Sequence, residues 1–193
     1  MEKRRGIFSY WSTIQLVFIA LMVAADVGQG FVIKPLLGAV GIDEFIRLDL
    51  IIPTAFIIVT RLLVDKFGTI VLYEGMWGII ATLIMPTSFG SLPAPVKILG
   101  SLSKGLIFDS FMQLFKNRPT LRVLTAAIVG GIIDTAVFTV IRLVFGFPWS
   151  KAVQILVGVK TATGVAVSIA AALLAIGIWK SVKDTYLARS ISG

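Results

Sequence analysis

Seven ionisable side chains lie inside stretches that are otherwise apolar, and they are the residues of this sequence best placed to do chemistry. They are Asp26, Glu74, Lys104, Asp109, Asp134, Arg142 and Lys160. Charged groups are costly within a membrane, so they normally face the interior of a helix bundle or a wet cavity. These four carboxylates and three cations could bind a small polar molecule, or they could neutralise one another in structural pairs.

Residue types that are absent exclude several chemistries. The sequence has no histidine and no cysteine, so it lacks the commonest general base, the commonest transition-metal ligand and any thiol nucleophile. Lys160 precedes a threonine in LVGVKTATG, but a phosphate-binding loop needs glycine where Val159 and Gln154 stand. We therefore expect no enzymatic activity, no metal, no cofactor and no ATP hydrolysis by this chain alone.

The composition is typical of a membrane protein. The 193 residues are 57% hydrophobic and 15% charged, with a mean hydropathy of +0.97, whereas soluble domains are about 45–50% apolar and about 25% charged. We interpret residues 1–193 as one all-α domain, an integral membrane bundle of six transmembrane helices. The predicted spans are 11–33, 48–64, 68–86, 96–115, 120–146 and 150–180.

The distribution of cations predicts how the bundle is oriented. Eleven lysines and arginines fall in segments on the side of the N-terminus, four fall on the opposite side, and three lie within spans. Cytoplasmic loops carry such an excess, so we expect both termini in the cytoplasm of a multi-pass cell-membrane protein. The net charge of +8 is then a topology signal, and we expect no nucleic-acid partner.

Depth along the spans gathers some of the charged groups toward the outer side. Lys104 lies about 10 Å inside the outer end of its span, and Lys160 lies slightly deeper. Asp134 and Arg142 belong to the same outer half of the fifth span. Convergent polar groups in an apolar bundle predict a small-molecule site that opens to the outside.

Six residues make up the predicted substrate site. They are Glu74, Trp77, Lys104, Asp134, Trp149 and Lys160. We expect the lysines to hydrogen-bond or neutralise the ligand, the carboxylates to tune the lysines, and the tryptophans to stack on a planar ligand. Tryptophans near a membrane surface also form interfacial belts, and Glu74 stands close enough to the inner start of its span to lie too deep for direct contact.

Lys104 and Asp109 are expected to have separate roles. They are five residues apart, which places them about 140° from each other around a helix. Lys104 shares its face with Ser101 and Phe108. We therefore expect Lys104 to serve the ligand and Asp109 to pair with another helix.

Two further features leave alternatives open. Ala20, Ala24 and Gly28 recur at every fourth position of the first span, and this spacing lets a second helix approach closely, from within the chain or from a partner subunit. The following segment, 34–50, is long and semi-apolar and carries three carboxylates. It either folds back as a cap over the site or forms an ordinary amphipathic connector.

Six spans in this length, both ends inside, and the Ala20-x-x-x-Ala24 pair resemble the substrate-capture (S) component of energy-coupling-factor (ECF) transporters. The closest similarity is to the hydroxymethylpyrimidine/thiamine type. It covers about 66–111, with a Lys-x-Gly start at Lys66, an in-span Glu74, and Gly105 with Asp109 on the fourth span.

The resemblance implies a vitamin-binding membrane subunit whose ligand is thiamine or hydroxymethylpyrimidine. In that family the ligand lies on the outer side among the last three spans, under the first loop. A transmembrane coupling subunit contacts the alanines of the first span, here Ala20 and Ala24, and ATPase subunits act in trans.

The alternative is a self-sufficient secondary transporter coupled to protons or ions. Glu74, Asp109 and Asp134 would then form a proton relay. The sequence shows no inverted repeat of the kind that many secondary transporters contain, which favours the S-component interpretation.

Overall fold

The structure is a computed structural model that describes residues 10–40, 48–84 and 93–192, without the side chains of Lys34, Val159 and Lys160. Every regular element within these ranges is a helix, and none is a strand. The predicted all-α class is therefore confirmed. The elements are α1 (Thr13–Val40), η2 (Leu48–Leu50), α2 (Ile51–Val64), α3 (Thr69–Ile84), α4 (Ala94–Leu114), α5 (Pro119–Thr125), η3 (Ala126–Gly130), α6 (Gly131–Val144), α7 (Trp149–Val157), α8 (Val159–Val182) and α9 (Tyr186–Ser192).

Five of the predicted spans correspond to continuous helical segments, and the sixth is interrupted. The helix predicted over 150–180 is split into α7 and α8 at Gly158, whose backbone is extended with φ −81° and ψ 174°. A Cβ atom at this position would collide with the carbonyl oxygen of Gln154, so glycine is the residue that permits the break. The first helix is longer than predicted, because α1 continues through Pro35 to Val40.

The helices pack side by side, with α3 against α4 and α2 against α8. A Cβ atom on Gly105 would lie 2.8 Å from the Cα of Val71, so the absent side chain is what allows α4 to approach the start of α3. On the other side of the bundle, α8 contributes the buried residues Ala171, Ala172 and Ala175. Small residues thus set the spacing at both contacts.

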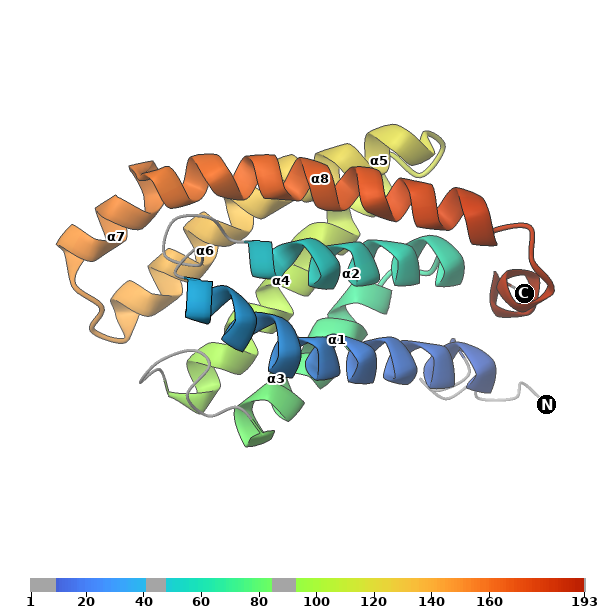
Figure 1. Cartoon of the computed structure of the whole chain (residues 1–193), viewed down its shortest axis with the longest axis horizontal. Helices are drawn as coiled ribbons and strands as arrows, with labels where there is room; N and C mark the ends of the chain where they lie inside the picture. The colour runs from blue at the N-terminus through green and yellow to red at the C-terminus, as the bar shows by residue number, and fades with distance from the viewer. Residues whose placement is uncertain (1–9, 41–47, 85–92, 193) are drawn as a thin grey trace, which may run out of the picture.

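One end of the bundle, which we call the terminal end, holds the start of α1 together with α9 (Figure 1). The Gln15 side-chain amide donates a hydrogen bond to the Ile191 carbonyl at 2.8 Å and joins the two elements. The opposite end, which we call the α7 end, holds α7 and the end of α6. The question of a cap over 34–50 stays open, because 34–40 extend α1 and 41–47 lie outside the described residues.

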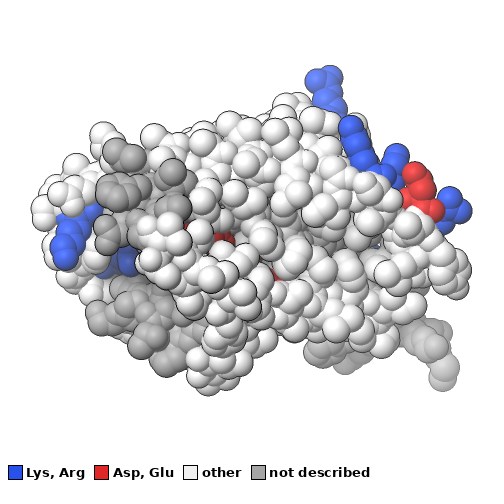
Figure 2. All heavy atoms as spheres, in the orientation of Figure 1, with Lys and Arg blue, Asp and Glu red and all other residues white. Residues whose placement is uncertain are grey.

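Three helical segments in the described part of the chain are long and apolar enough to cross a membrane. They are Thr13–Val40, Pro119–Val144 and Thr161–Val182, and Thr69–Ile84 is a shorter apolar helix. Large hydrophobic side chains along them are exposed, among them Leu21 at 64%, Val140 at 58% and Leu173 at 59%. In Figure 2 the charged groups gather at the two ends of the molecule and leave the middle of this face almost uncharged. Such a surface indicates a membrane protein.

Candidate functional site

The centre of the candidate site is an ion pair between α3 and α4. The Lys104 Nζ lies 2.6 Å from the Glu74 Oε1, and the Glu74 side chain is 3% exposed while that of Lys104 is 24% exposed. Glu74 is therefore within direct reach of Lys104, so depth does not separate the two groups. The two charges neutralise each other, which is one of the alternatives that the sequence left open. Part of the Lys104 side chain remains accessible.

Two further carboxylates lie within electrostatic range of the Lys104 ammonium, Asp134 of α6 and Asp26 of α1. Among the described residues, carboxylates from α1, α3 and α6 therefore interact electrostatically with Lys104, and that of Glu74 contacts it directly. We call Asp26, Glu74, Lys104 and Asp134 the polar cluster.

The polar cluster lies near the middle of the bundle. Lys104 stands midway along α4 (Ala94–Leu114), and Asp26 stands midway along α1 (Thr13–Val40). The outer-half depth of the site stays a prediction. Sites midway along spanning helices are usual where a small molecule or ion must cross a bilayer.

Asp26 is held by two hydrogen bonds. The Tyr73 hydroxyl donates to its Oδ2 at 3.0 Å, and the Gln29 side-chain amide donates to its Oδ1 at 3.1 Å. Asp26 is 4% exposed and Tyr73 is fully buried. Because Tyr73 and Glu74 are consecutive in α3, the Asp26–Tyr73 contact connects α1 to the residue that holds Lys104.

A π-helical turn precedes Asp134. The segment Ala126–Gly130 interrupts the helix between α5 and α6, and Ala126, Ala127 and Gly130 are buried against neighbouring helices. A π-turn adds a residue to one turn and rotates the rest of the helix, and such turns are frequent at functional sites. The turn therefore fixes the direction in which Asp134 leaves its helix.

Arg142, two turns beyond Asp134 on α6, lies against aromatic rings. Its Cζ is 5.1 Å from the centre of the Phe138 ring and 4.8 Å from that of Phe147. Distances of this size allow cation–π attraction. The guanidinium therefore sits between two rings at the α7 end of the helix.

The remaining residues of the predicted site have varied positions. Trp77 is partly buried and packs against the core. Trp149 begins α7 and is 69% exposed, so the described contacts do not place it in the polar cluster. Lys160 belongs to the first turn of α8, but its side chain lies outside the described residues. The stacking role of the tryptophans and the ligand contact of Lys160 stay predictions.

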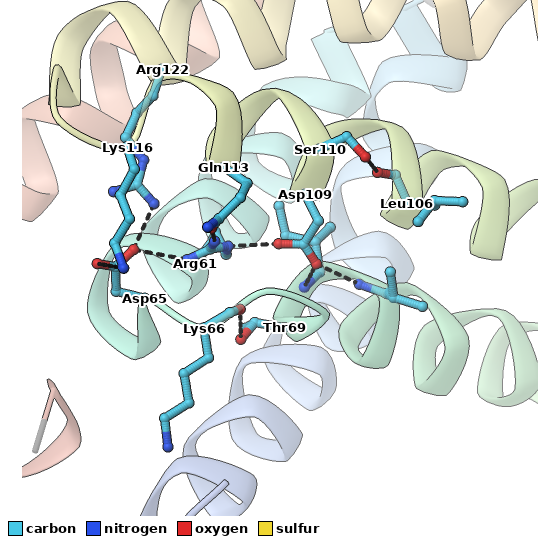
Figure 3. Close-up of polar contacts among 12 residues, drawn as sticks. Arg61, Asp65, Lys66, Thr69, Leu106, Asp109, Ser110, Gln113, Lys116 and Arg122 are labelled. Atoms are coloured by element: carbon cyan, nitrogen blue, oxygen red, sulfur yellow. Dashed lines mark hydrogen bonds and ion pairs between the residues drawn. The ribbon is translucent and has the colours of Figure 1, made fainter. Parts of the chain in front are cut away.

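Asp109 belongs to a second network near the terminal end (Figure 3). Its Oδ1 accepts a hydrogen bond from the Arg61 Nε at 2.6 Å, and both side chains are fully buried. Its Oδ2 accepts the backbone N–H groups of Ile70 at 2.8 Å and Val71 at 3.2 Å. Asp109 thus pairs with another helix, as predicted, and also satisfies free N–H groups in the first turn of α3.

The same network continues to the ends of α2 and α4. Arg61 also donates to Asp65 at 2.9 Å and to the Gln113 side-chain oxygen at 3.1 Å. Asp65 accepts a further hydrogen bond from Arg122 at 2.7 Å and lies 3.8 Å from the Lys116 ammonium (Figure 3). Four helical segments, α2 to α5, are joined here, which is the arrangement of a structural network.

The small residues of α1 face outward. Ala24 and Gly28 are exposed and Ala20 is partly buried, and a Cβ atom built on Gly28 would meet nothing within 4 Å. Packing inside the chain therefore does not explain Ala24 and Gly28. This α1 surface, defined by Ala20, Ala24 and Gly28, is free within the described structure to contact lipid or another subunit.

Sequence reasoning missed two features of these networks. Tyr73 is absent from the predicted site, although its position beside Glu74 and the presence of an in-span Asp26 are signals of a polar contact. Arg61 was counted as a cytoplasmic cation, whereas the structure buries it completely. An arginine that follows a run of apolar residues can lie in a cytoplasmic segment or be buried at the end of its helix. The sequence pattern is the same in both cases.

Comparison of the chain with known protein families, with curated protein sequences and with solved structures found no match.

Proposed function

We propose that this chain is a membrane-embedded substrate-binding subunit of the ECF S-component kind, which captures a small cationic vitamin or precursor at the polar cluster. The observation that carries the proposal is the Lys104–Glu74 pair with Asp26 and Asp134 around it, in the middle of an apolar bundle. Buried ionisable groups of this kind mark substrate or ion sites in membrane proteins.

The charge of the cluster favours a cationic ligand. Lys104 is already paired with Glu74, so it is less available to an anion. Asp134 adds a carboxylate within electrostatic range of the Lys104 ammonium. A ligand with a positive ring or an amidine-like group would pair with Asp134 and accept stacking from Trp77, which makes thiamine the best single candidate.

The proposed topology is six spans with both termini in the cytoplasm. Support comes from the position of α9 beside the start of α1 and from the concentration of cations in the segments at the terminal end. The shorter helices α2 and α3 would cross as inner members of the bundle. The α7 end would then face outward and admit the ligand.

Transport would need partners in trans. The α1 surface offers small residues to a transmembrane coupling subunit, since exposed Ala24 and Gly28 permit close helix approach. ATPase subunits would supply the energy, because this sequence contains no phosphate-binding loop.

The midplane position of the cluster also favours a second function, a proton- or ion-coupled secondary transporter. Asp26, Glu74 and Asp134 would then carry the proton or ion between α1, α3 and α6. Asp109, which the sequence placed in such a relay, is held by Arg61 in the structural network and is less suited to the role.

A titration of the purified chain with thiamine in detergent tests the proposed function. Asp134→Asn keeps the shape of the side chain and removes its charge. Loss of one charge-assisted contact of about 1.5–3 kcal/mol should weaken binding by roughly tenfold to a hundredfold. Lys151→Met, an exposed change on α7, is the control and should bind normally.

Two results would decide against this function. Absence of thiamine binding by the wild-type chain would reject this ligand. Uptake by the chain alone in proteoliposomes, driven by a proton or ion gradient, would favour the secondary transporter.

A further inference from the structure

The contact between Asp26 and Tyr73 joins α1 to the polar cluster. Asp26 lies on the inward side of α1, two residues from the outward-facing Gly28. Tyr73 joins it to α3 at 3.0 Å. One short stretch of α1 therefore touches the interior of the polar cluster and also carries the exposed α1 surface.

The geometry points to Asp26 and Tyr73 as positioning residues that transmit the charge state of the Glu74–Lys104 pair to α1. This inference rests on the proposed function, because it treats the polar cluster as the ligand site. It goes beyond that function by assigning Asp26, a member of the polar cluster, and Tyr73, which lies outside the cluster, a role in the position of α1. A ligand that changes the pairing of Lys104 would thereby alter the position of α1.

The first step is electrostatic. The Lys104 ammonium attracts the Asp26 carboxylate as well as that of Glu74. Charges are weakly screened in an apolar interior, so a change at Lys104 alters the electrostatic energy of the Asp26 carboxylate. Asp26 must respond by moving, by changing partner or by taking up a proton.

The second step is mechanical. The fully buried Tyr73 hydroxyl lies 3.0 Å from the Asp26 Oδ2 and 3.3 Å from the Met22 carbonyl oxygen, and Gln29, one turn further along α1, also donates to Asp26. Both acceptors of the Tyr73 proton belong to α1, so the hydroxyl joins α3 to this helix whichever acceptor it serves. A rearrangement at Asp26 is therefore passed to the backbone of α1 and not absorbed by a loop.

The absence of cysteine allows a direct test. A single cysteine at Gly28→Cys, where a Cβ meets nothing within 4 Å, can carry a nitroxide spin label on the α1 surface. Gly177→Cys on α8 is the matched control, because it is also exposed and its Cβ also meets nothing within 4 Å. Lys104→Met is then introduced into each labelled protein.

We expect Lys104→Met to change the accessibility or mobility of the label at Gly28→Cys by at least about twofold, as residues in one network are coupled to this extent. The label at Gly177→Cys should not change. Tyr73→Phe removes only the hydroxyl, and in that background the effect of Lys104→Met on the Gly28→Cys label should disappear. Reintroducing tyrosine restores it.

The inference is overturned if Lys104→Met leaves the Gly28→Cys label unchanged, or if the change survives in Tyr73→Phe. An equal change at Gly177→Cys would also overturn it, because the perturbation would then be global. Should Lys104→Met fail to fold, Glu74→Gln supplies the same disturbance of the pair with a side chain of equal size. None of these measurements needs a ligand, so failure of thiamine binding in the detergent titration remains a separate result.

Discussion

At the residue scale, Lys104 and Asp109 show how one helix can serve two networks. They stand five residues apart on α4, and the structure places Lys104 with Glu74 and Asp109 with Arg61. The expected division between a site lysine and a structural aspartate is supported for Asp109. Lys104 also contributes to the fold, because it pairs with the buried Glu74. Removing the lysine would therefore affect both stability and binding.

Asp109→Leu should strongly destabilise the protein. The substitution leaves the fully buried Arg61 without its carboxylate partner and removes the acceptor for two N–H groups of α3. Breaking a buried pair in this way costs about 3–5 kcal/mol. Thermal unfolding in detergent measures the effect, and Asp109→Asn, which retains one acceptor oxygen, should lose less. Unfolding temperatures equal to wild type in both variants would contradict the structural role.

Sequence reasoning could identify these charged residues but not all of their partners. Helical spacing was sufficient to separate Asp109 from Lys104, because rotation per residue is fixed. It could not predict that Glu74 reaches Lys104, since that depends on how closely α3 and α4 approach. It also could not identify the Asp26–Tyr73 contact, which depends on the packing of α1 against α3.

At the element scale, glycine and aspartate residues set the contact between α3 and α4. Gly105 lets α4 approach the first turn of α3, and Asp109 then reaches the N–H groups of Ile70 and Val71. Gly68, at φ +87°, precedes α3 in a conformation that favours glycine. Gly68, Gly105 and Asp109 therefore have a structural explanation that needs no ligand.

Gly105→Ala should therefore loosen the α3–α4 contact. The added Cβ would lie 2.8 Å from the Val71 Cα and 2.9 Å from the Ile70 carbonyl oxygen, both backbone atoms that cannot rotate away. Overpacking of this kind costs about 1–3 kcal/mol. Gly177→Ala, in open space on α8, should be neutral or slightly stabilising. The comparison is made by thermal unfolding, and equal stability of the two variants would argue against a close contact at Gly105.

The α1 surface gives a second prediction at this scale. Ala24→Trp places a large side chain on an exposed position, so folding and ligand binding by the isolated subunit should survive while partner-dependent uptake is lost. Val23→Trp is the matched control on the same helix, because Val23 is fully buried and the change should impair folding itself. If Ala24→Trp also unfolds the isolated subunit, this surface packs within the chain.

Most helices could be predicted from hydropathy and breakers, because long apolar runs and flanking proline residues are strong signals. Two local irregularities could not be predicted from these signals. The break at Gly158 depends on a collision that only the folded backbone reveals. The π-helical turn Ala126–Gly130 lies in an ordinary apolar sequence and arises from packing against neighbouring helices.

At the scale of the whole molecule, the cation distribution supports the proposed orientation, although some cations have structural roles. Arg61 and Arg122, both counted on the cytoplasmic side, are buried in the Asp109 and Asp65 network. The cations that remain exposed at the terminal end, such as Lys116, Lys180 and Lys183, still favour cytoplasmic termini.

Reporter fusions should place both termini in the cytoplasm. A reporter that is active only in the cytoplasm should be active at either end of the chain, and a reporter that requires export should be inactive at both. A third fusion point between α6 and α7, at Gly146, should show the reverse pattern because it lies at the proposed outer end. Opposite locations for the two termini would rule out six spans.

The central claim, that the polar cluster binds a small ligand, is tested most directly by native mass spectrometry of the purified protein. The account predicts a non-covalent small-molecule adduct on the wild-type chain, and thiamine added to stripped protein should restore an adduct of the same mass. Asp134→Asn, prepared in the same way, should lose the adduct while remaining folded. A wild-type chain that carries no adduct and gains none with thiamine, or an adduct that persists unchanged in Asp134→Asn, would contradict the claim.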